Sequence, residues 1–188
     1  MGQAIKKNKV EYIDRVHGNS KGWITRSCID ENGYSQWHYK YLELKETDLT
    51  GENIYITLNT FYKPCRRLEC IKELNFVYID LDYYKTKYTK EQVIMNLESN
   101  YFNKIIPATN YIIDSGRGLA LIWLINKVPS NALPLWKAVQ EYLYNQLKEF
   151  GADRQALDAT RILRVPGSIN SKSKTVVSII DEYDYIYD

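Results

Sequence analysis

The chain has 188 residues, a formal net charge of +2 and 45% hydrophobic residues. This length suits one good-sized domain, or one domain with an N-terminal extension, and the hydrophobic share is enough for a buried core. No apolar run approaches the ~20 residues of a membrane-spanning helix, so we expect no membrane partner. An odd number of cysteines without a recognisable secretory leader predicts reduced thiols and a cytoplasmic protein.

Residues 1–70 are predicted to form a mostly β N-terminal subdomain that packs on the core, after a basic arm at residues 1–9. The stretch "GWITRSCIDENGYSQWHYK" indicates two strands around the turn Glu31-Asn32-Gly33, because Asn-Gly is a strong hairpin signal. A further strand is indicated by "NIYITLNTFY", at residues 53–62.

Residues 71–188 alternate strands with helices. A strand at 75–83 is followed by a helix with Thr89 as its N-cap and Gln92 at the capping-box position. Two strands within 109–125 surround a tight turn, and a helix then runs from Ser130 to Gly151. Its helical spacing predicts a buried face of Leu135, Val139, Tyr142, Leu143 and Leu147.

Two further strands are predicted at residues 160–165 and 175–180. The order is then βαββαβ plus one strand, which predicts an α+β fold class with a ferredoxin/RRM-like palm. Such a palm packs its helices on one face of an antiparallel sheet and leaves the other face free.

The strand at 75–83 carries two carboxylates. Because successive side chains alternate, Tyr78, Asp80 and Asp82 share one face, which we expect the helices to leave free. Two neighbouring aspartates repel each other, and divalent cations relieve that repulsion most simply. Oxygen ligands without histidine or thiolate favour Mg²⁺ or Mn²⁺, and a two-metal site stabilises in-line displacement at phosphorus.

Asp158 is the predicted third acidic ligand, because the strand that follows it can lie beside the strand at 75–83 in a ferredoxin-like sheet. Asp153 and Asp181 are the alternatives. The same segment is basic: between residues 154 and 174, five cations against one acid give a local charge of +4. These cations are Arg154, Arg161, Arg164, Lys172 and Lys174.

The turn in "DSGRG" offers backbone N–H groups, the Ser115 hydroxyl and the Arg117 guanidinium. Glycine-rich turns let a backbone approach phosphate oxygens closely, and arginine binds such oxygens in a bidentate manner. Alone, the motif is equally well a plain hairpin turn. Beside metal-binding carboxylates and a basic strand, it predicts a cradle for a triphosphate.

With these residues the sequence resembles the archaeo-eukaryotic primase superfamily, in particular the primase-polymerases of plasmid, phage and mobile-element replication proteins. The family's Asp-x-Asp strand is matched by "VYIDLD", its small-residue turn by "DSGRGLALIW", and its acid before a basic strand by "LDATRILRVPGSINSK". The resemblance covers roughly residues 50 to 175 and includes "NIYITLNTFYKPCRR". One departure is Ala120, where many members carry a histidine that contacts the triphosphate.

The resemblance implies a metal-dependent, template-directed nucleotidyltransferase, a DNA primase or primase-polymerase. Its expected partners are a single-stranded DNA template, NTP or dNTP, and a helicase or accessory domain. The catalytic residues, which would also hold two Mg²⁺ or Mn²⁺ ions, would be Asp80, Asp82 and Asp158. The nucleotide-binding residues would be Ser115, Arg117, Arg164 and Lys172.

Several further residues have two interpretations. Asn59 and the Arg66-Arg67 pair would touch nucleotide or template, or belong to a solvated loop. Tyr83 and Tyr84 would stack on a base or sugar, whereas Trp123 is expected in the core. Two other functions stay open: a nuclease or nicking replication initiator with the same carboxylates, and a non-catalytic nucleic-acid-binding module, which Ala120 would suit.

Overall fold

The computed structural model describes residues 11–188, and the basic arm predicted at residues 1–9 lies outside them. Its larger sheet is antiparallel and five-stranded. In spatial order the strands are β11 (Ser178–Glu182), β6 (Tyr111–Asp114), β7 (Leu119–Pro129), β5 (Ile71–Leu81) and β4 (Thr60–Phe61). β5 begins earlier than predicted and ends at Leu81, so Asp82 lies just beyond it. The strands predicted within 109–125 and the turn between them are confirmed.

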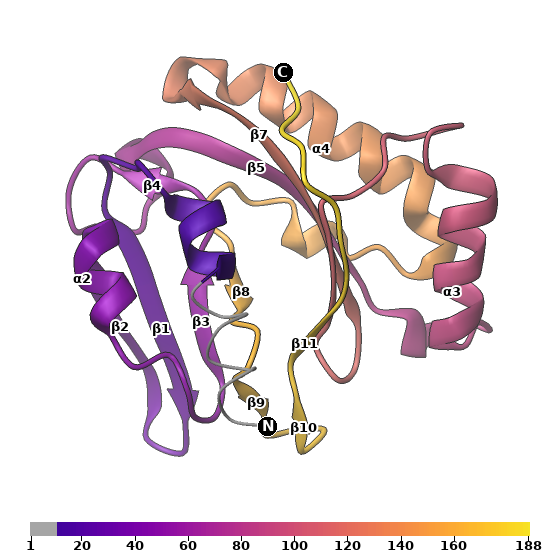
Figure 1. Ribbon diagram of the computed structural model, residues 1–188, viewed down its shortest axis with the longest axis horizontal. Helices are drawn as coiled ribbons and strands as arrows, with labels where there is room; N and C mark the ends of the chain where they lie inside the picture. The colour runs from indigo at the N-terminus through magenta and orange to yellow at the C-terminus, as the bar shows by residue number, and fades with distance from the viewer. Residues whose placement is uncertain (1–10) are drawn as a thin grey trace.

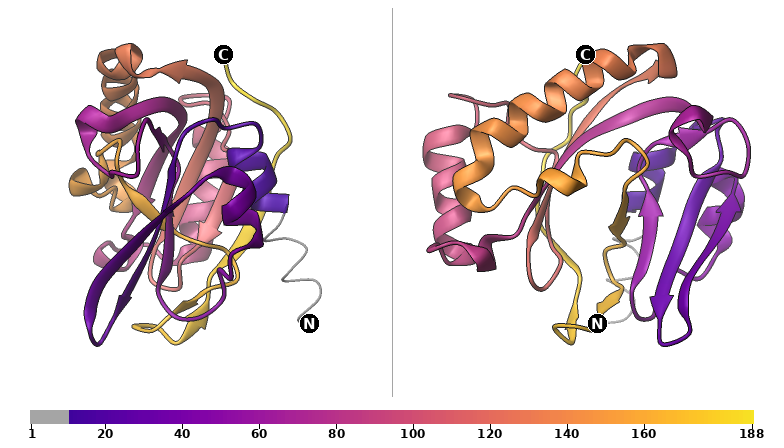
Figure 2. Two further views of the ribbon diagram at one scale, coloured as in Figure 1. Left: turned by 90° about the vertical axis from the view of Figure 1, so that its left-hand side faces the viewer. Right: turned by 180° about the vertical axis from the view of Figure 1, so that it is seen from behind.

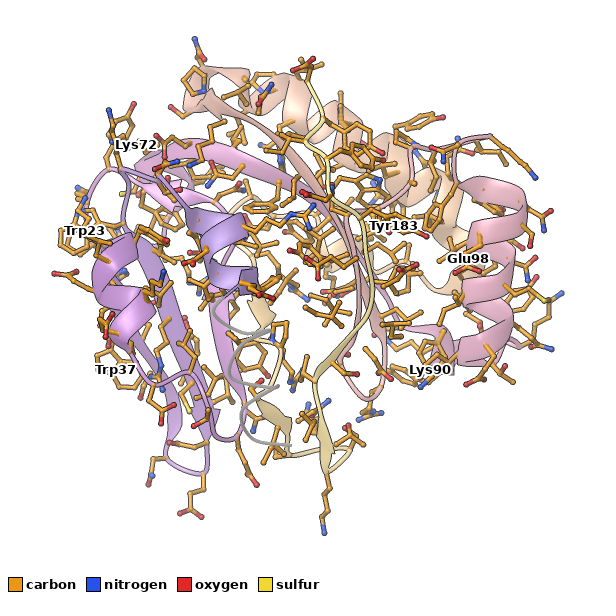
Figure 3. All side chains as sticks on the ribbon, viewed as in Figure 1. Trp23, Trp37, Lys72, Lys90, Glu98 and Tyr183 are labelled. Carbon is orange, nitrogen blue, oxygen red and sulfur yellow. The ribbon has the colours of Figure 1, made fainter. Side chains whose placement is uncertain are left out.

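A second antiparallel sheet has four strands. In spatial order they are β2 (Gly33–Tyr39), β1 (Ile24–Asp30), β3 (Ile54–Thr57) and β8 (Ile162–Arg164). The hairpin predicted around Asn32-Gly33 is confirmed, and Gly33 adopts the positive φ of 111° that such a turn requires. A small ribbon of β9 (Ile169–Asn170) and β10 (Thr175–Val176) completes the strands. Figure 3 shows Trp37 of β2 on the side of this sheet that is remote from the larger one.

Two helices, α3 (Lys90–Asn96) and α4 (Leu133–Leu147), lie on the side of the five-stranded sheet that points away from the four-stranded sheet (Figures 1 and 2). The predicted capping box of α3 is confirmed: the Gln92 amide N–H donates to Thr89 Oγ1 over 3.3 Å, and the Thr89 N–H donates to Gln92 Oε1 over 2.9 Å. Lys90, labelled in Figure 3, then ties α3 to the end of β6 through an ion pair of 2.9 Å with Asp114. The α+β fold class is confirmed.

The predicted buried face of α4 is confirmed at Leu143 and Leu147 and is wrong at the other three positions. Leu135, Val139 and Tyr142 are exposed. The face that is turned to the sheet consists of Trp136, Gln140, Leu143 and Leu147. Polar atoms of Trp136 and Gln140 hydrogen-bond the backbone of β5. The spacing of apolar residues cannot predict this face, because it takes no account of such hydrogen bonds.

A short helix at residues 11–17, which the sequence did not predict, bridges the two sheets. His17 is buried, and its Nε2 lies 2.9 Å from the Thr57 carbonyl oxygen of β3. The ring of Tyr12 meets the ring of Tyr111 of β6 edge-on, with 5.2 Å between their centroids. Asp14 ties this helix to α2 (Tyr41–Glu46) through Lys45, at 2.8 Å. One end of the space between the sheets is thereby filled.

The strand predicted at 160–165 was expected beside the strand at 75–83, and this placement is wrong. β8 pairs with β3 in the four-stranded sheet, where Tyr55 lies opposite Arg164 (Figure 2). The division into subdomains 1–70 and 71–188 stays a prediction, although β8 belongs to the second range and its partner β3 to the first. None of the helices within the described residues is long and apolar enough to cross a membrane.

β8 does not lie beside β5 because the edge of β5 that it would have covered is already occupied. Its backbone groups already have partners: the Trp136 indole N–H donates to the Phe76 carbonyl, and the Tyr78 N–H donates to Gln140 Oε1 over 2.9 Å. Farther along, the Asp153 N–H donates to the Asp80 carbonyl over 2.9 Å. Because α4 and the segment after it satisfy this edge, β8 is free to pair with β3.

Candidate active site

The space between the sheets is open where β5 ends. A cavity of about 500 Å³ lies there, and a smaller one of about 230 Å³ adjoins it. They share walls that come from both sheets and from the β6–β7 turn, including Tyr55, Asp82, Ser115, Arg161 and Arg164. The volume of the larger cavity is in the range of small-molecule and cofactor sites.

These two cavities bring the predicted site residues together. The larger one is lined by Asp82, Ser115, Arg117, Asp158, Arg164 and Lys172. The smaller one adds Asp80. Residues from the three predicted motifs, which are far apart in the sequence, thus face the same space.

Asp80 lies at the deep end of the site. Its side chain is 24% exposed, and burial raises the pKa of its carboxyl to about 6. Arg161 opposes this rise, while the like charges of Asp82 and Asp153 add to it. Ala120 is its partner on β7 and lies on the same face, so this alanine faces the smaller cavity.

Asp82 lies nearer the opening. Its Oδ2 accepts a hydrogen bond of 2.6 Å from Lys85 Nζ, which is an exposed ion pair. The β6–β7 turn passes close to it: a Cβ atom on Gly118 would lie 2.7 Å from the Leu81 carbonyl oxygen and 3.5 Å from Asp82 Oδ1. Glycine at position 118 therefore lets the turn lie directly against the carboxylates.

Asp158 lines the larger cavity, but its oxygens are already bonded. Oδ1 accepts from the Thr160 N–H and Oδ2 from the Thr160 hydroxyl, each at 2.9 Å. Asp153, which the sequence ranked lower, lines the smaller cavity together with Asp80 and Asp82. The structure thus places Asp153 closer to the deep carboxylate than the sequence predicted.

The opposite wall carries cations. Arg164 stacks over the Tyr55 ring at 4.8 Å and donates to Asn53 Oδ1 over 3.3 Å. Its Nε is buried without a hydrogen-bond partner, and burial lowers the pKa of its guanidinium. Within residues 11–188 no carboxylate forms an ion pair with Arg164, Lys172 or Arg117. These three side chains are free to bind an anion.

Two cations of the predicted basic segment lie elsewhere. Arg154 pairs with Glu141 at 3.9 Å and lines neither cavity. Lys174 is exposed in the turn between β9 and β10, with a φ of 56°. The net charge of +4 counted between residues 154 and 174 is therefore larger than the positive charge that this segment contributes to the site.

The β6–β7 turn has the shape that the motif predicts. The Ser115 N–H donates to the Gly118 carbonyl over 2.9 Å, and Gly116 takes a φ of +87°. Asn170 Nδ2 donates to the Ser115 carbonyl over 2.6 Å, which ties the turn to β9. Arg117 is exposed at the tip and stacks over the ring of Tyr84, at 4.8 Å, where both line the larger cavity.

The remaining candidates divide into cavity and core. Asn59 is buried: it donates to the Ala159 carbonyl and accepts from the Asn75 N–H, each at 2.9 Å, so it supports the site without reaching the cavity. Trp123 is in the core as expected. Arg66 lines the larger cavity and donates to the Thr160 carbonyl over 3.0 Å. Arg67 and Tyr83 line neither cavity.

The sequence predicted no individual role for Arg161 or Tyr55. Arg161 was counted among the cations, and its position three residues after Asp158 was the available signal. Tyr55 could not be assigned, because it reaches the site only through the unexpected pairing of β3 with β8.

A separate hollow of about 380 Å³ lies between α4 and β7. Its walls are apolar side chains such as Trp123, Trp136 and Leu143, with Asp188 as the charged residue. It has no cation to bind phosphate, so the paired cavities between the sheets are the better candidate site.

Within the described chain, no group of three or more Asp, Glu, His or Cys side chains is arranged to hold a metal ion. The three predicted carboxylates therefore form no preformed cage. Asp80 and Asp82 still fit Mg²⁺ or Mn²⁺, because Mg²⁺ is usually held by one or two carboxylates together with substrate phosphates and water. Their cavity is open to such a substrate.

Comparison with known proteins supports the fold. No protein-family model matches the chain. A curated "Replication protein" of Clostridium perfringens is 77% identical over 188 residues, which are 100% of this chain and 46% of that protein. The chain thus spans about half the length of this relative.

Solved structures are similar in fold at low identity. The AEP domain of the cyanophage S-2L primase-polymerase has a TM-score of 0.66 and 13% identity, covering 97% of this chain and 93% of its own. The catalytic domain of primase RepB′, solved in complex with initiator DNA, has a TM-score of 0.60 and 10% identity, covering 97% and 87%. These likenesses confirm the fold that the sequence resemblance predicted.

Proposed function

We propose that this chain, an archaeo-eukaryotic primase domain by its fold, is the catalytic core of a template-directed nucleotidyltransferase. It would act as a DNA primase or primase-polymerase in the replication of a plasmid, phage or mobile element. The observation that carries the proposal is the arrangement around the paired cavities. The carboxylates Asp80 and Asp82 line them together with three cations, Arg164, Lys172 and Arg117, that form no ion pair within residues 11–188. A nucleoside triphosphate with a divalent cation has the complementary charges.

The cationic wall would bind the triphosphate. Arg164 lines both cavities and forms no ion pair with a carboxylate within residues 11–188, so its terminal nitrogens would bind a phosphate that enters the site. Arg117 and the backbone of the β6–β7 turn would hold the outer phosphates. Tyr84 and Tyr55 offer ring faces in the same cavity for a base or sugar.

The carboxylate wall would serve the transfer step. Mg²⁺ or Mn²⁺ held by Asp80, Asp82 and phosphate oxygens would supply charge stabilisation at the attacking and leaving oxygens. The 3′ oxygen of one nucleotide forms a bond to the α-phosphorus of the next, the bond to pyrophosphate breaks, and the hydroxyl proton passes to water. Asp80 must be ionised for this step, and Arg161 favours that state.

The third acid is Asp158 or Asp153. Asp158 stays the prediction from the motif, and it would have to exchange its bonds to Thr160 for a metal ion. Asp153 already lies in the smaller cavity with both other aspartates. Comparison of Asp153→Asn with Asp158→Asn decides between them, since only the ligand's substitution should weaken Mn²⁺ binding in the presence of nucleotide.

The proposal is tested by nucleotide incorporation opposite a single-stranded DNA template, with Mg²⁺ or Mn²⁺ and labelled NTPs or dNTPs. Incorporation that follows the template and disappears in Asp80→Asn supports it. Template cleavage without incorporation would favour the nuclease or initiator. Binding to the template with neither reaction would favour the non-catalytic module, for which Ala120 in the cavity wall is the supporting observation.

A further inference from the structure

Arg161 lies between two carboxylates that belong to different segments. One of its terminal nitrogens is 3.4 Å from Oδ2 of Asp80 and 3.7 Å from Oδ2 of Asp153. Within residues 11–188 neither carboxylate forms an ion pair with any other cation. The guanidinium therefore occupies the place beside Asp80 where a positive charge is needed.

The two carboxylates are held in place by the backbone and not by Arg161. The Asp153 N–H donates to the Asp80 carbonyl over 2.9 Å, and the Asp82 N–H donates to the Gly151 carbonyl over 2.8 Å. Asp153 Oδ1 accepts from the Gln155 N–H at 2.9 Å, which leaves Oδ2 turned toward Arg161. The carboxylate pair is thus expected to persist when the guanidinium leaves.

The hold of Arg161 on this pair is loose. Both nitrogen–oxygen distances exceed the roughly 2.7–2.9 Å of a strong charge-assisted hydrogen bond. Its side chain is 35% exposed and lines both cavities, the larger of which also contains Arg164 and Lys172. Its backbone is anchored, since its N–H donates to the Asp158 carbonyl over 2.9 Å. Rotation of the side chain alone would turn the guanidinium from the carboxylates toward the larger cavity.

We infer that Arg161 is a positioning residue that holds the cation place beside Asp80 in the substrate-free protein and moves to the triphosphate when nucleotide and divalent cation enter. This inference rests on the proposed function. Asp80 cannot face a guanidinium and a divalent cation at close range without repulsion between the two cations. The displaced guanidinium binds phosphate, so divalent cation and nucleotide bind cooperatively, and each strengthens the other by the same factor.

The test measures Mn²⁺ binding to the folded protein without template, by electron paramagnetic resonance. It is done alone and with a dNTP whose α,β bridge is a methylene group, after correction for Mn²⁺ bound to free nucleotide. For the wild type we expect the nucleotide to tighten Mn²⁺ binding by roughly tenfold or more. In Arg161→Gln we expect Mn²⁺ alone to bind more tightly than in the wild type, and most of the nucleotide's effect to disappear.

Arg164→Gln is the matched control, because it removes a cation from the same cavities that forms no ion pair with Asp80. Loss of positive charge alone would tighten Mn²⁺ binding in both variants, so a gain in Arg161→Gln no larger than in Arg164→Gln overturns the inference. Arg161→Lys keeps the charge and should keep Mn²⁺ binding weak in the absence of nucleotide. If it binds Mn²⁺ as tightly as Arg161→Gln, the inference also fails.

The outcome is separable from that of the proposed function. If the wild type incorporates no nucleotide while these binding differences hold, the proposed function fails and the inference stands. If Asp80→Asn binds Mn²⁺ as the wild type does, the cation is not at Asp80 and the inference is overturned, whatever the activity.

Discussion

The two walls of the site differ in how they are held. Asp80 lies in β5, with β7 on one edge and the 151–153 segment on the other, so backbone hydrogen bonds fix its position from both sides. The cations lie on a three-residue strand and on turns, at the ends of long side chains. Under the proposed function, the rigid wall would set the position of the transferred phosphate, and the adaptable wall would adjust to the substrate.

Substitutions on the rigid wall should have the largest effect. Asp80→Asn or Asp82→Asn removes a carboxylate that would hold the divalent cation. Because the cation would stabilise the transition state by several kcal/mol, incorporation should fall on the order of a thousandfold. Nucleotide-independent template binding should be almost unchanged. Steady-state incorporation and a DNA-binding titration measure the two effects. Asp181→Asn, on β11 at the far edge of the sheet, is the matched control and should be close to wild type.

On the adaptable wall, Arg117→Ala should lower incorporation by on the order of a hundredfold, because charge builds on the leaving pyrophosphate. Template binding and melting temperature should stay nearly constant. Arg154→Ala, an exposed arginine outside both cavities, is the control. Near-normal activity of Arg117→Ala would reduce the "SGRG" turn to a plain hairpin.

Nucleotide binding can also be strengthened from β7, at Ala120, which faces the smaller cavity beside Asp80. Ala120→His places a second donor near the phosphates and should keep or raise incorporation. The measurement is kcat and KM for the nucleotide, and a lower KM is the expected sign. A loss of activity with an unchanged melting temperature would show that this cavity has no room for the ring.

The raised pKa of Asp80, about 6, predicts a pH dependence at the rigid wall. Below that pH the carboxyl is protonated, so Mn²⁺ binding and incorporation should fall by about tenfold per pH unit at low Mn²⁺ concentration. Stability has the opposite sign. The folded state binds more protons than the unfolded state between the ordinary pKa of 3.8 and about 6, so the free energy of unfolding decreases as pH rises through this window.

Thermal melting of metal-free protein between pH 4 and 7 checks this prediction. The decrease should be present in the wild type and absent in Asp80→Asn. Because the carboxylate is a quarter exposed, we expect about 1–2 kcal/mol across the window. Identical pH profiles of the two proteins would contradict the assignment of the raised pKa.

The smallest effect is expected from the exposed lysines beside the adaptable wall. The double variant Lys172→Glu with Lys174→Glu should bind single-stranded DNA with a weaker dependence on salt. If each lysine neutralises one phosphate, the slope of log affinity against log salt concentration should decrease in magnitude by about 1–1.5. Lys137→Glu on α4 with Lys148→Glu just after its end is the control, and its slope should be unchanged. Equal slopes in all three proteins would remove the basic segment from the DNA path.

The sequence predicted the order of elements, the carboxylates and the turn, because each depends on a local pattern. It did not predict which segment would pair with β5. The pairing depends on Trp136 and Gln140 of α4, whose side chains hydrogen-bond the edge of β5. These contacts join residues about 60 positions apart, and no local sequence pattern predicts them. Because β8 pairs with β3 and Asp153 bonds the free edge of β5, Arg164 and Asp153 line the same cavity as Asp80. The candidate third acid and the role of Arg161 therefore could be identified only from the structure.

The pairing of β3 with β8 has a consequence for how the molecule is made. Tyr55 meets Arg164 only after the chain between them has been synthesised, and contacts of such long sequence separation form slowly. Until then the outer edge of β3 has no partner, and an unpaired strand edge invites association with other chains. Pairing of β8 with β3 both closes that edge and assembles the site, so a chain that has not yet formed this pair is expected to be inactive and prone to aggregate.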